Sequence, residues 1–402
     1  MIKSFRINKR LPFRLLIWTL WISTILLQYV RATIMRLPII GSYPDSVIAV
    51  YFITMIVLSV HEIQLRSGDI IFVSMVTFCF LMENLIRGHG NEYLEAYFPG
   101  FLLNTLPLYI VGVALAQHKD EETIIDGMYT LSCITIVVNF IYKVIFGTPM
   151  DAVMSQYVGD MDLAYKLLPH CCLVVYYARK KANWINITLT VFGTFYLLML
   201  GTRGAALILL INIAWNFVMG QTSRRMIARI LILCCGVAAF LSSSLYDSAI
   251  LWMYKMAQKF GLSIRIFDKL LQGVQMGSSG RNALAETLVV SVKEHFIFGT
   301  GLCSDRTIVG VYAHNIALEL WVEFGVIIGT IILAALIITF LRGYLHGDNS
   351  AEKGLIIVLI CSSFFKLFLS GSFMDDRWFF ALIGLCVGVI RKSEYKRREE
   401  IT

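Results

Sequence analysis

Long apolar runs recur along almost the whole chain, and they restrict the possible folds more than any other feature. One run, residues 184–220, contains a single charged side chain, that of Arg203. A straight helix over those residues would be about 55 Å long, whereas the apolar core of a bilayer is about 30 Å thick. We therefore predict two spans that meet at Gly201-Thr202-Arg203, a helical hairpin with the arginine at its tip. Basic residues before and after the two spans place that tip on the outer side of the membrane.

The full set of apolar runs predicts an all-α fold, a polytopic membrane helical bundle of about twelve spans. Apolar residues make up 57% of the chain and charged residues only 15%, against roughly 25% charged residues in soluble domains. The expected spans are residues 14–30, 46–60, 69–86, 97–117, 126–146, 163–178, 184–200, 204–220, 227–243, 316–341, 354–372 and 377–391. The sixth is the weakest because it contains Lys166, Pro169 and His170, and a re-entrant segment is the alternative there.

The same runs divide the chain into three parts. Residues 1–243 hold membrane helices 1 to 9, residues 244–315 form one helical outer (extracytoplasmic) loop subdomain, and residues 316–402 hold membrane helices 10 to 12 and a basic tail. Within the loop, residues 247–260 and 281–296 are predicted helices. In the second of these, an apolar residue recurs at every fourth position, which predicts a stripe packed on the membrane domain. The stripe consists of Leu284, Leu288, Val292 and Phe296, and the turn before the helix, which should cap it, is Gly277-Ser278-Ser279-Gly280.

The net charge of +8 is distributed as the positive-inside rule requires, so it does not indicate a nucleic-acid partner. Lysine and arginine cluster at both termini and in the even-numbered connections. The short odd-numbered connections hold few basic residues: Arg31, Arg36, Arg87, Arg203 and Arg377. Because an even number of spans puts both termini on one side, we expect a multi-pass protein of the cytoplasmic (inner) membrane with both termini cytoplasmic. The first apolar run has no small-residue cleavage site and is expected to be a retained span.

Three motifs on the predicted outer face carry side chains suited to chemistry. The first is Arg203 at the hairpin tip, and the second is Arg281 in "SSGRNALAE", where the backbone N–H groups of a helix start favour anions. The third runs from the glycine turn at Gly299 and Gly301 to the His314-Asn315 pair before the tenth span. No strand precedes those glycines and no lysine follows in Walker spacing, so they are not a nucleotide-binding loop.

In this order, the motifs resemble those of the O-antigen ligases and polysaccharide repeat-unit polymerases of bacterial surface-glycan assembly. The resemblance rests on "GTRGA", "SGR", "GTG" and the His-Asn pair, and it covers roughly residues 184–330. It implies a membrane glycosyltransferase that performs inverting transfer at the outer leaflet from a polyprenyl-diphosphate-linked glycan, without metal or cofactor. It also implies that Arg203 and Arg281 bind the diphosphate and that His314 is the catalytic base for the acceptor hydroxyl. Thr202 and Phe298 depart from the usual pattern at the hairpin and at the glycine turn.

The chemistry of these side chains agrees with that implication. Two guanidinium groups can bind diphosphate oxygens bidentately, and an imidazole that titrates near neutrality suits a general base. The alternatives to substrate binding or catalysis are structural roles: an interfacial arginine for Arg203, a salt bridge with Glu286 for Arg281, and a structural interface histidine for His314. Weaker candidates for supporting roles are Asn315, Glu319, Glu323, Arg306 and Arg377. Eight of the nine cysteines lie in apolar runs and Cys303 lies alone in the outer loop, so neither a disulfide nor a metal site is expected.

Two enzyme functions and one transport function fit the sequence. The favoured one polymerises lipid-linked repeat units into a surface polysaccharide, and the ligase alternative moves the glycan to an envelope acceptor such as lipid A core. The expected partners are the lipid-linked donor, the glycan acceptor, the bilayer, a flippase and a chain-length regulator protein. A transporter or flippase of lipid-linked sugars is the rival of another class, but transporters usually show two related halves, which this sequence lacks.

Overall fold

A computed structural model describes most of the chain in two compact units. The described residues are 11–35, 43–87, 91–146, 150–151, 156–157, 160–200, 202–218, 244–259, 281–348 and 350–399. Unit 1 comprises Met1–Glu62 and Thr123–Met276, and unit 2 comprises Ile63–Glu122 and Gly277–Thr402. Apart from a two-residue strand pair, β1 (Met150–Asp151) with β2 (Gln156–Tyr157), every described element is helical, as the apolar runs predict.

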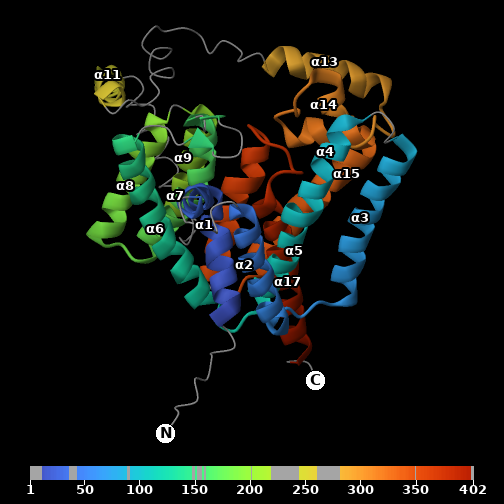
Figure 1. Ribbon diagram of the computed structural model, residues 1–402, viewed down its shortest axis with the longest axis horizontal. Helices are drawn as coiled ribbons and strands as arrows, with labels where there is room; N and C mark the ends of the chain where they lie inside the picture. The colour runs from blue at the N-terminus through green and yellow to red at the C-terminus, as the bar shows by residue number, and fades with distance from the viewer. Residues whose placement is uncertain are drawn as a thin grey trace. The chain divides into compact units, whose positions relative to one another are not determined.

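Unit 1 contains the predicted hairpin. Its helices are α1 (Leu11–Ile34), α2 (Pro44–Ser59) with the short η2 (Val60–Glu62), α6 (Glu121–Phe146, of which the first two residues belong to unit 2), α7 (Asp160–Lys180), α8 (Trp184–Met199), α9 (Arg203–Val218) and α11 (Ser244–Lys259). The apolar run breaks between α8 and α9, so Arg203 is the first residue of α9. Both helices pack on α7 (Figure 1). The side-chain oxygen of Asn183 caps α8 by accepting from the N–H of Asn186 at 2.8 Å.

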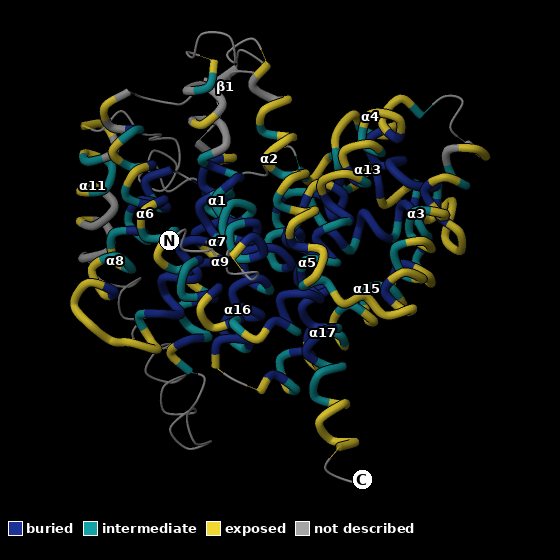
Figure 2. The backbone as a smooth tube through the Cα atoms, turned by 60° about the horizontal axis from the view of Figure 1, so that its bottom comes forward, coloured by how far each residue is buried: buried dark blue, intermediate teal, exposed yellow. Residues whose placement is uncertain are grey.

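Unit 2 contains α3 (Ser67–Arg87), α4 (Glu92–Gly100), η3 (Phe101–Thr105), α5 (Pro107–Gln117), α13 (Arg281–Glu294), α14 (Ser304–Val309), α15 (Ile316–His346), α16 (Ser350–Leu359), η4 (Ile360–Phe365) and α17 (Arg377–Glu399). At its centre α5 and α17 are in backbone contact. A Cβ at Gly112 would lie 2.1 Å from the oxygen of Ala381, and one at Gly384 would lie 1.9 Å from that of Tyr109. Small residues permit this close approach in membrane helices, and Figure 2 shows the first half of α17 almost entirely buried.

The helices agree with an integral membrane protein. Among the described residues, three helical segments are long and apolar enough to cross a bilayer, namely Glu92–Gln117, Glu121–Lys143 and Ile316–His346, and several shorter helices are also apolar. The predicted ninth span, residues 227–243, lies outside the described residues. The uncertain sixth span is one helix, α7, which continues through Pro169 and pairs Lys166 with Asp162 at 2.6 Å.

Ion pairs and hydrogen bonds define two ends of unit 2. At one end, basic side chains of α17 bind acidic ones: Arg391 reaches Asp69 at 2.6 Å, and Lys392 reaches Glu352 at 2.7 Å. At the other end, α13 and α14 lie beside the start of α4 and the start of α15 (Figure 1). There the amide of Asn91 donates to the carbonyl of Leu302 at 3.1 Å. All the predicted site residues of unit 2 belong to this second end.

The apolar stripe predicted for α13 packs as expected over its middle. Leu288 and Val292 are buried against α15. Leu284 is only half-buried, and Phe296 is 51% exposed because α13 ends at Glu294. The stripe is therefore shorter than predicted, and the Gly277–Gly280 turn before it lies outside the described residues.

Candidate functional site

Arg281 and His314 are brought together by one short turn of backbone, residues 368–369. The guanidinium of Arg281 donates through Nη1 to the carbonyl of Leu369 at 2.7 Å. The side-chain amide of Asn315 donates to the preceding carbonyl, that of Phe368, at 3.4 Å. The first turn of α13 and the residues before α15 therefore meet on two consecutive carbonyls. This places the guanidinium and the imidazole at the same end of unit 2.

His314 is held in an unusual backbone conformation. Its φ is +58°, in the left-handed region that non-glycine residues seldom adopt. Such conformations persist only where the surroundings impose them, and they occur often at functional sites. Two contacts impose this one. The backbone N–H of Ala313 donates to Asp305 at 2.8 Å, and the ring of Tyr312 lies 4.2 Å from the imidazole, centroid to centroid.

The surroundings also set the charge of His314. Burial and the nearby guanidinium of Arg281 lower its pKa to about 4. The imidazole is therefore neutral at physiological pH, the form in which a histidine can accept a proton. Among the described residues, its Nδ1 is buried and has no hydrogen-bond partner. Within that part of the chain, then, no carboxylate orients the ring through Nδ1.

Asn315 caps helix α15. Its side-chain oxygen accepts from the backbone N–H groups of Ala317 and Leu318, at 3.0 and 3.2 Å. This is the usual role of asparagine at a helix start. Since Nδ2 donates to the carbonyl of Phe368, both polar atoms of the side-chain amide have hydrogen-bond partners. Asn315 therefore positions His314 rather than offering a free polar group.

Arg306 lies at the centre of a buried ionic cluster. Its side chain is 1% exposed, and its Nη1 binds Asp305 at 2.8 Å and Glu319 at 3.4 Å, both of which are fully buried. Burial alone would lower the pKa of Arg306, but the two carboxylates outweigh that effect and raise it. The guanidinium also stacks on the ring of Tyr97, 4.6 Å from its centroid. A cation so enclosed supports the loop before His314 and is not at a substrate-accessible surface.

Glu319 and Glu323 continue this cluster into α15. Glu319 also accepts hydrogen bonds from the Ser372 hydroxyl and from the N–H of Phe373. Glu323 accepts from the N–H of Cys303 at 2.9 Å. Both carboxylates are buried, so they bind loop segments together rather than lying at a membrane interface.

The "GTG" turn packs into a break in helix α15. At Gly325, φ is +79° and ψ is 163°, which interrupts the helix and frees the carbonyls of the preceding turn. Thr300 N–H donates to the carbonyl of Val322 at 2.8 Å, and Gly301 N–H donates to that of Glu323 at 3.0 Å. A Cβ at Gly299 would lie 2.5 Å from the Glu323 oxygen. The turn thus uses its N–H groups within the protein, which agrees with the rejection of a nucleotide loop.

Two predicted site residues remain, Arg203 and Arg377. Arg203 begins α9 in unit 1, half-buried beside the buried Thr202, so its meeting with Arg281 and His314 stays a prediction. Arg377 begins α17, directly after Asp376. The carboxylate of Asp376 caps that helix and binds Lys366 at 2.9 Å.

Asp305 is the residue of this region that sequence reasoning missed. It stands beside Arg306 in the short helix α14, in a segment whose sequence has no apolar period, so no pattern distinguished it. Among the described residues, no group of three or more histidine, cysteine or acidic side chains could hold a metal ion.

Comparison of the chain with known proteins supports the importance of this region. No curated protein matches the chain. Residues 188–334 match the family model described as O-antigen ligase, a segment that includes Arg203, Arg281 and His314. Over these residues the chain is similar to the O-antigen ligases, which confirms the resemblance indicated by the order of its motifs.

Proposed function

We propose that this integral membrane protein transfers a glycan from a polyprenyl-diphosphate carrier to a sugar hydroxyl at the outer face of the cytoplasmic membrane. The observation that carries the proposal is that Arg281 and Asn315 bind the same 368–369 turn, which brings the guanidinium near the neutral imidazole of His314. The family match supports a lipid-linked glycan as the substrate.

The roles follow from charge and geometry. Arg281, with Arg203 as its predicted companion from unit 1, binds the diphosphate and stabilises the negative charge that grows as the glycosidic C–O bond breaks. His314 takes the proton of the acceptor hydroxyl, and its exposed side leaves Nε2 for that contact because Nδ1 is buried. The acceptor oxygen bonds to the sugar carbon from the face opposite the leaving group, so the linkage inverts. The carrier diphosphate leaves with the electron pair.

A bound diphosphate would also make the imidazole a better base. In the free protein the guanidinium of Arg281 disfavours the imidazolium. Anionic oxygens placed between the two groups would offset that effect and raise the pKa of His314 toward its ordinary value. Proton uptake is then favoured only when the donor is present.

We favour repeat-unit polymerisation, in which the acceptor is another lipid-linked unit. The ligase reaction is the second candidate, and the description of the matching family favours it. Purified protein with lipid-linked repeat units alone distinguishes the two. Laddered lipid-linked products identify a polymerase, whereas product formed only after addition of an envelope acceptor identifies a ligase.

Variants test the residue roles. We expect His314→Ala, Arg281→Ala and Arg203→Ala each to abolish transfer while the protein remains folded in the membrane. Two residues near the other end of α15 provide matched controls, His346→Ala and Arg342→Ala, which should keep wild-type transfer. Wild-type product lengths from His314→Ala or from either arginine variant would refute the assigned role.

A further inference from the structure

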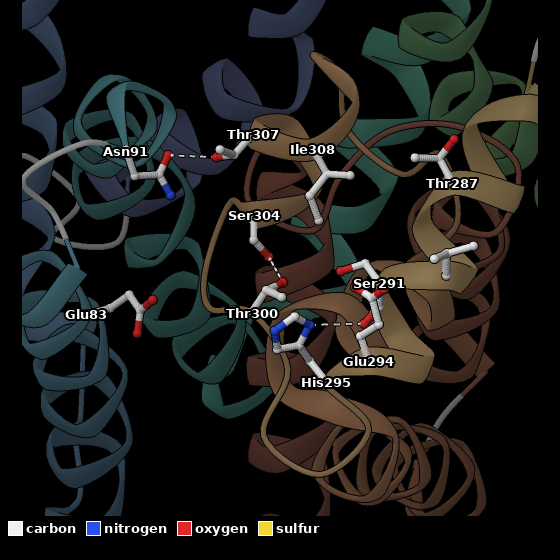
Figure 3. Close-up of a pocket in the computed structure, with 11 residues that line it drawn as sticks. Glu83, Asn91, Thr287, Ser291, Glu294, His295, Thr300, Ser304, Thr307 and Ile308 are labelled. Atoms are coloured by element: carbon white, nitrogen blue, oxygen red, sulfur yellow. Dashed lines mark hydrogen bonds between the residues drawn. The ribbon is translucent and has the colours of Figure 1, made fainter.

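A cavity in unit 2 lies apart from the Arg281–His314 site. Its volume is about 600 Å³, within the roughly 300–1,000 Å³ typical of small-molecule sites. It is bounded by the end of α3, the residue before α4, one face of α13, and α14 with the turn before it (Figure 3). It therefore belongs to the same end of unit 2 as the proposed catalytic groups.

The lining of the cavity is rich in hydroxyl and carboxylate groups. Hydroxyl groups come from both α13 and the α14 region: Thr287, Ser291, Thr300, Ser304 and Thr307. Glu83 approaches from α3 on one side, with Thr300 and His295 on the other (Figure 3). Val290 and Ile308 supply apolar surface. Four of these hydroxyl groups, those of Thr287, Thr300, Ser304 and Thr307, donate hydrogen bonds within the protein, so they offer acceptor oxygens, as the carboxylates do. Apolar atoms supply the larger part of the lining surface. Acceptor oxygens beside apolar surface match the hydroxyl groups and the C–H face of a sugar ring.

The charge of the cavity separates it from the diphosphate site. Its two acidic side chains are Glu83 and Glu294, and within the described residues no lysine or arginine lines it. A carboxylate accepts hydrogen bonds and repels anions, so this cavity is unsuited to a phosphate or an acidic sugar. It suits an uncharged sugar whose hydroxyl groups donate to the carboxylates.

The cavity and Arg281 lie on different faces of α13. The cavity face is formed by positions that share one side of a helix, Thr287, Val290, Ser291 and Glu294. Arg281 shares its side with Leu288 and Val292, which pack on α15. A sugar in the cavity is therefore not the unit joined to the diphosphate.

We propose that this cavity binds an uncharged sugar unit of the glycan, at a distance from the bond that is made or broken. The inference rests on the proposed function. The sugar belongs either to the distal part of the donor glycan or to the acceptor glycan, and both present the same chemistry to the cavity.

Saturation-transfer NMR on the full chain in nanodiscs tests the inference. The probes are two neutral trisaccharides, chitotriose and maltotriose, and one acidic one, trigalacturonate. We expect at least one neutral probe to bind and trigalacturonate not to bind. Ser291→Trp, which fills the cavity, should abolish that binding, and Glu294→Gln, which keeps the shape, should weaken it about tenfold. Glu286→Gln, the same change on an exposed part of α13 outside the cavity, should bind as wild type does.

Absence of binding by both neutral probes, preference for trigalacturonate, or unchanged binding in Ser291→Trp and Glu294→Gln would overturn the inference. Inorganic pyrophosphate reports on the proposed function separately, because its binding should depend on Arg281 and persist in Glu294→Gln. In the transfer reaction, a bound trisaccharide that competes with the lipid-linked donor assigns the cavity to the donor. Competition with the acceptor assigns it to the acceptor, and competition with neither contradicts a glycan subsite.

Discussion

The packing of the glycine turn into the break of α15 predicts a severe effect of Gly325→Ala. The backbone angles at Gly325 belong to a region that only glycine adopts readily, so an alanine there costs about 1–3 kcal/mol in strain. The new Cβ would also lie 2.2 Å from the carbonyl oxygen of Ile297 and 2.4 Å from its carbon. That backbone is held in place because Val326 N–H donates to the Phe296 carbonyl at 2.8 Å. Strain and overlap together should exceed about 4 kcal/mol, a large part of the roughly 5–15 kcal/mol that stabilises a domain.

Gly310→Ala provides the matched control. Gly310 also has a positive φ, +76°, but a Cβ added there meets nothing within 4 Å. Its cost is the left-handed backbone alone, about 1–2 kcal/mol. The difference between the two variants therefore combines the overlap with residues 296–301 and the extra strain of the Gly325 angles.

The assay is the fraction of folded protein left after heating, measured by size-exclusion chromatography at one heating rate. The two costs differ by at least about 2 kcal/mol, so at about 2–4 °C per kcal/mol for a unit of this size, Gly325→Ala should melt at least about 4 °C below Gly310→Ala. Gly325→Ala should also lose transfer activity, because the turn at residues 299–301 leads into the segment that carries His314. Equal melting temperatures for the two alanine variants would refute the proposed packing of residues 296–301 against Gly325.

Three further predictions concern the charged and buried groups. Arg306→Met leaves two buried carboxylates without their cation and should lower the free energy of unfolding by about 3–5 kcal/mol. In thermal unfolding, the double variant with Glu319→Gln should be less destabilised than the sum of the two single changes. Simple additivity would contradict the ionic cluster. Because burial and Arg281 lower the pKa of His314 to about 4, Arg281→Met should raise that pKa toward the unfolded value of about 6.5, as NMR titration of the imidazole would show. The sign for stability follows: protonation favours the unfolded state, so the wild type loses stability as pH falls from about 6.5 to about 4, and Arg281→Met loses less. Cys303 is fully buried beside Met374, and burial raises its pKa, so maleimide should modify it only after denaturation. Because Cys79 is exposed, mass spectrometry of the peptides locates the label, and a labelled Cys303 from native membranes would disprove its burial.

The helices and the motif residues could be predicted from the sequence because both leave local signals. The length of the apolar run at residues 184–220 required a break, and the structure has it between α8 and α9. Arg281 and His314 were singled out by residue type at the edges of such runs. The stripe on α13 followed from its period, although the helix ends before Phe296 and leaves that ring exposed.

The rest depends on contacts between distant residues, which leave no local signal. Nothing in the sequence indicates that Asp305 holds the backbone before His314, because a single aspartate in a helix as short as α14 forms no periodic pattern. Gly325 looks like an ordinary glycine within an apolar helix, and its unusual angles go together with close contact to the backbone of Ile297 and Phe298, far away in the sequence. The groups that bind Arg281 and Asn315 are the backbone carbonyls of residues 368–369. Every residue has such a carbonyl, so the side chains at these positions give no signal.

The motif residues of this region therefore fall into two physical classes that one activity assay cannot separate. Gly299, Gly325 and Glu323 fix the shape of the end of unit 2, so their loss should lower stability and transfer together. Arg281 and His314 are partly exposed and carry no comparable share of the core, so their loss should lower transfer while the melting temperature changes little. Arg306 lies in α14, just before the segment that carries His314, but it is enclosed by carboxylates, which places it with the first class despite its charge. Plotting residual transfer against melting temperature for these variants would show two groups, and a stable but inactive Arg306→Met would move Arg306 into the second.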